Sequence, residues 1–275
     1  MAGSITGPMA KLGRARKHYE VLRDMLTAPG RRHGFYSYPV TSQVHREGLE
    51  YRFYVGEVPS FEAQGERVAL ILGDFLFNLR ATLDQIVYEL HVRHFRGNVP
   101  DDVADKTQFP IFSTPRTDSK GRPTPTSKWT SIRELSKRQQ AAIQWLQPYN
   151  RRNDKLLYAR DALEALADLN NIDKHRSLHV AQEAVAAVVT HRFPPSTGFR
   201  YEVFWGPLVS NAEVYRRTFT NPPADIAEHV NVNHEVTVGV RVQERGQPVE
   251  VLALAEFLLN RVEKEIIPRL TTALN

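Results

Sequence analysis

Between residues 64 and 95 the chain carries its most regular pattern of apolar positions. Leucine or isoleucine recurs there at alternating steps of four and three residues, at Leu72, Leu76, Leu79, Leu83, Ile86 and Leu90. Residues at this spacing share one face of an α-helix, and such a face is normally buried against the rest of the protein. The pattern predicts one long helix over 64–95.

Weaker patterns of the same period predict further helices over 8–27, 131–147, 154–175 and 249–274. Ser131 and Glu134 have the spacing of a capping box, which places the start of one helix at residue 131. The stretch 96–130 is rich in Pro, Asp, Thr and Gly, and only the apolar run FPIF at 109–112 interrupts it. We expect a long surface loop there, either a lid or binding loop or a plain insertion.

Strand-like alternation of apolar and polar residues occurs near the start of the chain and in its last third. A hairpin with arms 35–46 and 50–58 turns at Glu47-Gly48, and later strands are predicted over 178–193, 200–206, 212–220 and 230–242. Strands and helices do not alternate as a parallel sheet requires. The predicted fold is therefore α+β: a central helical bundle with an antiparallel sheet formed by the N-terminal hairpin and the C-terminal strands, in a single domain over 1–275.

Composition narrows the classes of function. The chain has no cysteine, which excludes disulfides, thiolate metal sites and cysteine nucleophiles and fits a reducing compartment. The first residues lack the apolar run of a secretory signal, and no stretch is long and apolar enough to span a membrane. These features predict a cytoplasmic protein that does not enter the membrane.

The formal net charge of +5 and the isoelectric point of about 9.4 favour anionic partners. Basic residues are scattered among carboxylates, and no nucleic-acid-binding motif accompanies them. Ordinary solvated faces explain this charge most simply, while nucleic acid is not excluded as a partner. Phosphate-loop, dinucleotide-binding, serine-hydrolase and zinc-protease motifs are all missing from the sequence.

Polar residues interrupt two apolar helical faces. Arg80 and Asp84 lie beside the leucine stripe of the long helix, and at i, i+4 they can form an ion pair. In the helix that ends near 175, apolar stripes give way to Asn170, Asp173 and Arg176. Such a change is typical of a pocket rim. It is equally typical of a helix terminus whose free carbonyls are bonded by Lys174, His175 and Arg176.

Our functional hypothesis is a small anionic-ligand-binding or catalytic pocket between helices 72–94 and 163–179. Arg80, Asn171, Lys174 and Arg176 would bind the ligand, and His175, Asp84 and Asp173 would be the catalytic candidates. His175 is the proposed acid/base group because the pKa of an ordinary imidazole lies near neutrality. No cofactor is implied, and oligomeric state stays open.

Two alternatives use the same residues or their neighbours. In the first, the polar residues form a structural buried network that locks two helices together in a non-enzymatic interaction protein. In the second, His91 and His94 at i, i+3 join Asp84, Asp173 or His179 as metal ligands of a hydrolase. A His-x-x-His pair is common by chance, so the preferred prediction includes no metal.

Four segments carry a family resemblance: LGDFLFNLRATLDQIVYEL (72–90), QFPIF (108–112), LQPY (146–149) and LNNIDKHRSLH (169–179). Their order resembles a family of uncharacterised bacterial proteins over roughly 70–180, and the resemblance implies no activity. Helical HEPN-type ribonucleases also combine polar residues on one helix with arginine and histidine on another. Their arginine precedes the histidine by four to six intervening residues, a spacing that Arg176 and His179 do not have, so ribonuclease activity is not carried over.

Overall fold

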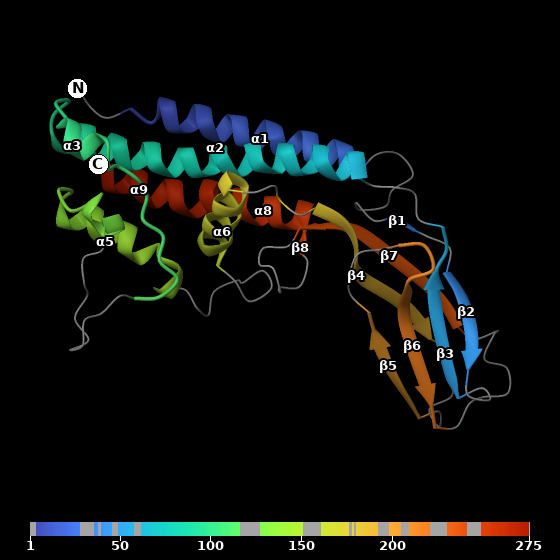
Figure 1. Ribbon diagram of the computed structural model, residues 1–275. Coiled ribbons are helices and arrows are strands. Elements are labelled where there is room, and N and C mark those ends of the chain that lie inside the picture. Colours follow the sequence, from blue (N-terminus) through green and yellow to red (C-terminus); the bar gives the residue numbers. More distant parts are fainter. Residues whose placement is uncertain are drawn as a thin grey trace. The chain divides into compact units, whose positions relative to one another are not determined.

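The chain divides into two compact units in the computed structural model (Figure 1). The helical unit comprises Met1–Val21, Leu70–Leu178 and Ala253–Asn275, and the sheet unit comprises Leu22–Ala69 and His179–Leu252. The structure describes residues 4–27, 36–37, 40–45, 49–57, 62–115, 127–150, 161–175, 178, 180–191, 198–204, 209–220, 230–240 and 249–274. That both units belong to one domain over 1–275 stays a prediction.

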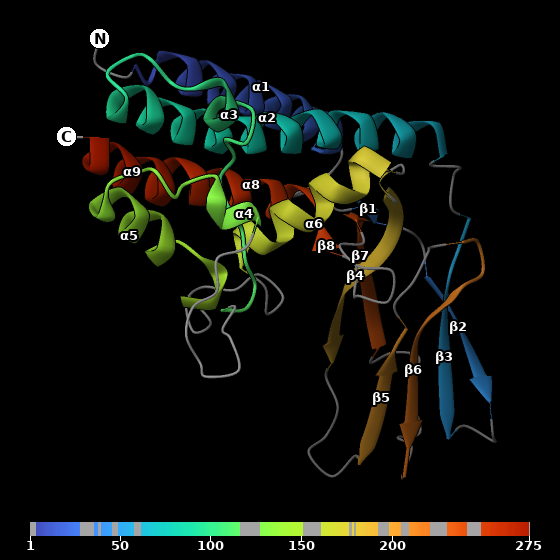
Figure 2. The same ribbon diagram turned by 60° about the vertical axis from the view of Figure 1, so that its left-hand side comes forward.

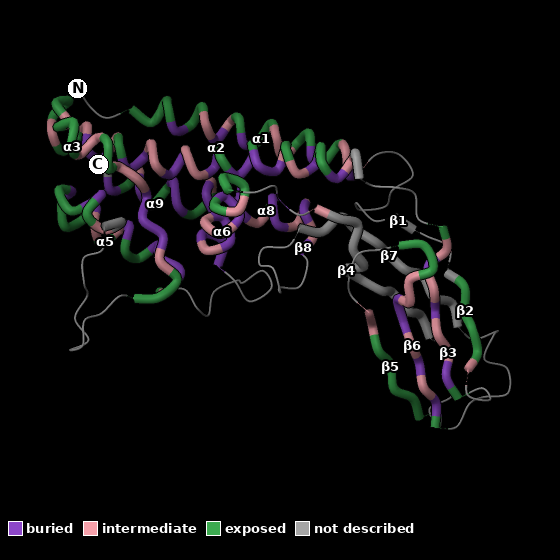
Figure 3. The backbone as a smooth tube through the Cα atoms, viewed as in Figure 1, coloured by how far each residue is buried: buried purple, intermediate pink, exposed green. Residues whose placement is uncertain are grey.

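Long helices run alongside one another in the helical unit (Figures 1 and 2). They are α1 (Thr6–Leu26), α2 (Glu62–His94), α8 (Val251–Arg261) and α9 (Ile267–Leu274), and only the end of α1 and the starts of α2 and α8 belong to the sheet unit. The leucine stripe of α2 is fully buried, as its period predicts. Buried stretches, in purple, recur along α2 in Figure 3. The long helix predicted over 64–95 is thus confirmed.

Shorter helices connect and cover this layer: α3 (Asp101–Ala104), α4 (Ser127–Thr130), α5 (Lys137–Trp145), the 3-10 turn η2 (Pro148–Asn150) and α6 (Ala162–His175). The capping box of α5 lies at Ser136 and Gln139. The prediction that placed it at Ser131 and Glu134 is wrong. Ser131 instead uses its hydroxyl to donate to the carbonyl of Gln108, which fixes a different segment.

All strands of the sheet unit pair antiparallel within the described residues, and they form two sheets. One sheet has the order β1 (Tyr36–Ser37), β7 (Val230–Val240), β4 (Val180–His191), with β8 (Val249–Glu250) also paired to β7. The other has the order β2 (Val40–His45), β3 (Glu50–Val55), β6 (Glu213–Phe219), β5 (Phe199–Val203). The α+β class is confirmed, and each sheet joins N-terminal to C-terminal strands.

The stretch predicted as a surface loop, 96–130, contains structure. Helix α3 lies within it, and Phe109, Pro110 and Ile111 are buried, with Phe109 fully inaccessible. Residues 116–126 of that stretch lie outside the described part. None of the described helices is long and apolar enough to cross a membrane.

Candidate functional site

Arg80 and Asp84, the charged residues predicted to pair on α2, do form an ion pair, with 3.0 Å between Arg80 Nη2 and Asp84 Oδ1. Both also bind the backbone of Phe109. Arg80 donates to the Phe109 carbonyl at 2.6 Å, and the Phe109 N–H donates to Asp84 Oδ1 at 2.8 Å. The pair therefore satisfies the polar backbone groups of a buried residue, which would otherwise lose their hydrogen bonds to water.

Two further side chains hold the segment Gln108–Phe112, here called the QFPIF segment. Ser131 donates to the Gln108 carbonyl at 2.8 Å. Gln147, which is fully buried, donates to the Pro110 carbonyl at 2.9 Å and accepts from the Phe112 N–H at 3.0 Å. Side chains from α2, from the turn before α5 and from the turn after α5 thus replace the backbone partners that this irregular segment lacks.

His91 extends this network at the C-terminal end of α2. Its ring is fully buried, and its Nε2 lies 2.8 Å from the Ser131 carbonyl oxygen. A carbonyl only accepts, so Nε2 carries the hydrogen in this contact. Burial lowers the pKa of His91 below its ordinary value, and the hydrogen bond to Ser131 opposes that effect only in part. His91 is therefore a neutral structural residue at neutral pH.

We expect acid to destabilise the protein through His91. Because its folded pKa is lowered, the unfolded chain binds the proton first, so the free energy of unfolding falls as pH drops through about 6.5. Urea unfolding at about pH 7.5 and about pH 5.5 measures this slope, which His91→Gln should reduce. An equal slope in wild type and His91→Gln would contradict the assignment.

Helix α6 meets α2 at Gly73. A Cβ placed on Gly73 would lie 2.5 Å from Asp173 Oδ1, so the missing side chain is what allows this approach. Asp173 is exposed overall, yet partial desolvation against α2, and then the charge of Asp74, raise the pKa of its carboxyl above the ordinary value. Two carboxylates therefore meet where the sequence predicted an anionic ligand. Arg80 lies seven residues beyond Gly73, about 10 Å further along the axis of α2. Its guanidinium is hydrogen-bonded to the Phe109 carbonyl.

The remaining predicted site residues lie at the end of α6. Asn171, Lys174 and His175 are exposed. Arg176 and His179 lie outside the described residues. Asn170, one turn before Lys174, is buried. The structure thus brings Asp173 to α2 but joins Arg80 and Asp84 to the QFPIF segment instead of to the end of α6.

The positions of His91 and His94 bear on the alternative in which these two residues bind a metal ion. His91 directs Nε2 at a backbone carbonyl, whereas His94 is exposed and packs edge-on against Phe95. Among the residues that the structure describes, no group of three or more His, Asp or Glu side chains is arranged to hold a metal ion.

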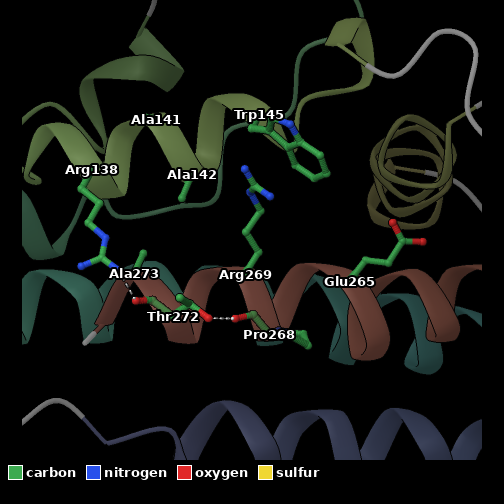
Figure 4. Close-up of a pocket in the computed structure, with 9 residues that line it drawn as sticks. All are labelled: Arg138, Ala141, Ala142, Trp145, Glu265, Pro268, Arg269, Thr272 and Ala273. Carbon is green, nitrogen blue, oxygen red and sulfur yellow. Dashed lines mark hydrogen bonds between the residues drawn. The ribbon is translucent and has the colours of Figure 1, made fainter.

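A groove between α5 and α9 brings together side chains that the sequence-based hypothesis does not include (Figure 4). It has a volume of about 750 Å³, and its lining is Arg138, Ala141, Ala142, Trp145, Glu265, Pro268, Arg269, Thr272 and Ala273. The guanidinium carbon of Arg269 lies 3.6 Å from the centre of the Trp145 ring. Arg138, nearer the end of α9, donates to the Thr272 carbonyl at 3.2 Å. We call it the α5–α9 groove.

The charge of the α5–α9 groove is positive. Its single carboxylate, Glu265, forms an ion pair with Arg261, which is buried and also lies 3.9 Å from Asp161. Arg138 and Arg269 have no ion pair with a carboxylate in the described part of the chain. A π-helical turn, Val262–Ile266, lies just before Pro268, and such turns often occur at functional sites.

Sequence reasoning missed this groove for a physical reason. Arg138 and Trp145 are i, i+7 on α5. Glu265 in the π-helical turn is followed at steps of four and three residues by Arg269 and Thr272 on α9. Each set reads as an ordinary solvated helix face. Only the packing of α5 against α9 places the two faces opposite each other. The one available signal was Trp145, a large aromatic residue that is exposed at the end of a helix.

In comparisons with known proteins, no protein-family model, curated protein or solved structure matches the chain.

Proposed function

We propose that the protein binds a small organic anion with a planar group in the α5–α9 groove. The observation that carries this proposal is the guanidinium of Arg269 stacked at 3.6 Å over Trp145, with Arg138 further along the same groove. The sequence-based hypothesis placed an anion between helices 72–94 and 163–179. That location is disfavoured, because Asp74 and Asp173 supply negative charge there and Arg80 is engaged by Phe109.

The chemistry of the groove suits such a ligand. An arginine stacked on an aromatic ring keeps its guanidinium edge available for a carboxylate or phosphate, and the stacking fixes its orientation. Alanines 141, 142 and 273 leave space between the helices for a flat ring. The volume of about 750 Å³ lies in the range of small-molecule sites.

Adenosine monophosphate, adenosine and inorganic phosphate test the proposal, because only the first combines a planar ring with an anionic group. We expect titration with adenosine monophosphate to change Trp145 fluorescence and to give a calorimetric binding signal. Adenosine should bind with at least tenfold lower affinity. Benzoate serves as a second planar anion of smaller size.

Variants then locate the binding. Arg269→Gln and Trp145→Ala should each weaken binding about tenfold or more, whereas Arg93→Gln, at an exposed position outside the groove, should not. Either no response to both planar anions, or equal affinity in Arg269→Gln and wild type, would contradict the proposal.

A second candidate function rests on the network around the QFPIF segment. Arg80, Asp84 and Gln147 all bond its backbone, which supports a structural role for these residues in a non-enzymatic interaction protein. Both candidates describe a binding protein. The absence of cysteine fits a reducing compartment, and we assign the protein to the cytoplasm on that basis.

A further inference from the structure

A basic groove lies on α1 where this helix passes α2. Its lining is Gly7, Ala10, Lys11, Gly13, Arg14, Lys17 and Gln85, and its volume is about 560 Å³. We call it the α1 groove. It is separate in sequence and lining from the α5–α9 groove, and its chemistry is different: three cations and no carboxylate among the lining residues.

Helical periodicity explains why the cations are available. The face of α1 that carries Leu12, Ala15 and Leu22 is buried. Arg16, at the edge of that face, pairs with Glu263 and so has a structural partner. Arg14 and Lys17 lie on the opposite face, both are exposed, and no described carboxylate forms an ion pair with either.

Small residues leave the surface between the cations open. A Cβ placed on Gly13 would meet no atom within 4 Å. Lys11, Arg14 and Lys17 follow at three-residue steps, so about 9 Å of helical rise separates the first of these cations from the last. A chain of phosphates can therefore approach the helix backbone and contact all three cations.

An aromatic ring adds the second feature. Phe77 on α2 is 51% exposed, and Lys11 Nζ lies 5.7 Å from its ring centre. Cations that track a phosphate backbone, beside an exposed ring on which a base can stack, are the two features shared by proteins that bind single strands. A duplex hides its base faces, and a membrane offers no ring for stacking.

We infer that the α1 groove binds single-stranded nucleic acid, with Lys11, Arg14 and Lys17 on the phosphates and a base stacked on Phe77. Because the contacts are to phosphates and to one ring face, binding is independent of base sequence. The inference does not depend on the proposed ligand of the α5–α9 groove.

Fluorescence anisotropy of a fluorescein-labelled oligothymidylate, titrated with the full chain at several salt concentrations, tests the charge contribution. Three phosphate contacts predict a slope of log affinity against log salt of about −2 for a single strand. The triple variant K11A/R14A/K17A should lose most of this slope and at least tenfold in affinity. The matched triple R93A/K106A/K264A removes the same charge from exposed positions outside the groove and should retain both. Equal losses in the two triples would overturn the inference.

The aromatic contribution is tested separately. Phe77→Ala should weaken oligothymidylate binding about tenfold without changing the salt slope, and Phe77→Trp should restore affinity. Thermal melting verifies that each variant is folded. Unchanged affinity in Phe77→Ala, or equally tight binding to a duplex or to vesicles rich in phosphatidylserine, would overturn the single-strand inference. Arg269→Gln should bind oligothymidylate like wild type, so failure here and failure of the anion site are distinguishable.

Discussion

Replacing Asp84 with alanine should lower the free energy of unfolding by about 3 kcal/mol, measured by urea denaturation. The change removes the acceptor of the buried Phe109 N–H and leaves Arg80, which is 15% exposed, without its carboxylate. Both losses occur where water does not fully replace the lost partner, and for this reason the effect exceeds that of an ordinary surface ion pair.

Three variants separate the causes. Asp84→Asn keeps an acceptor for Phe109 but not the charge, so it should be less damaging than Asp84→Ala. Arg80→Ala should also destabilise by several kcal/mol, because the Phe109 carbonyl loses its donor. His175→Ala, on an exposed residue, should change stability by less than about 0.5 kcal/mol. If Asp84→Ala left the free energy of unfolding unchanged, the ion pair would not have the structural role assigned to it.

The helices were predictable because their signal is local. The leucine spacing of α2 records directly which face is buried, and burial agrees at Leu72, Leu79 and Leu90. The start of α5 was not predictable in the same way. Both Ser131 and Ser136 precede a Glu or Gln three residues later, and only the tertiary contact of Ser131 with Gln108 decides between them.

Strand pairing depends on distant parts of the chain, and there sequence reasoning was incomplete. Residues 35–46 alternate as one strand, yet the structure divides them between two sheets. Tyr36 pairs with Val236 in β7, whereas Val40 pairs with Val55 in β3. Alternation within a segment predicts a strand, but it carries no information about which partner lies beside it.

For the candidate site, the i, i+4 spacing correctly predicted that Arg80 and Asp84 form an ion pair. An unpaired charge beside a buried face is costly, so further hydrogen-bond partners were also expected. The nature of those partners could not be predicted, because they are backbone groups of Phe109, in a stretch whose composition indicates a surface loop. Similarly, Gly73 reveals its role only once α6 crosses α2 and Asp173 occupies the space of a side chain.

In the sheet unit, a buried arginine shows the same dependence on tertiary context. Arg217 in β6 is fully buried, and its guanidinium carbon lies 4.3 Å from the Phe199 ring centre and 5.6 Å from those of Tyr215 and Phe219. Arg216, on the other sheet face, pairs with Glu213 at 2.7 Å. Burial lowers the pKa of Arg217, while interaction with Tyr215 opposes this. Adjacent arginines in one strand thus have opposite environments, which follows from the two-residue period of a strand.

Arg217→Ala should therefore lower the free energy of unfolding by about 4 kcal/mol, because it opens a large cavity among three aromatic rings and removes their cation–π contacts. Arg217→Met keeps most of the volume but loses the interaction with Tyr215 and the cation–π contacts, so it should destabilise the protein less than Arg217→Ala does. Arg200→Met, at an exposed position on the neighbouring strand, should be neutral. Urea denaturation followed by circular dichroism measures all three. If Arg217→Met were as damaging as Arg217→Ala, the filled volume would not be what stabilises this sheet. The stabilisation would then come from polar interactions of the guanidinium that an apolar side chain cannot replace.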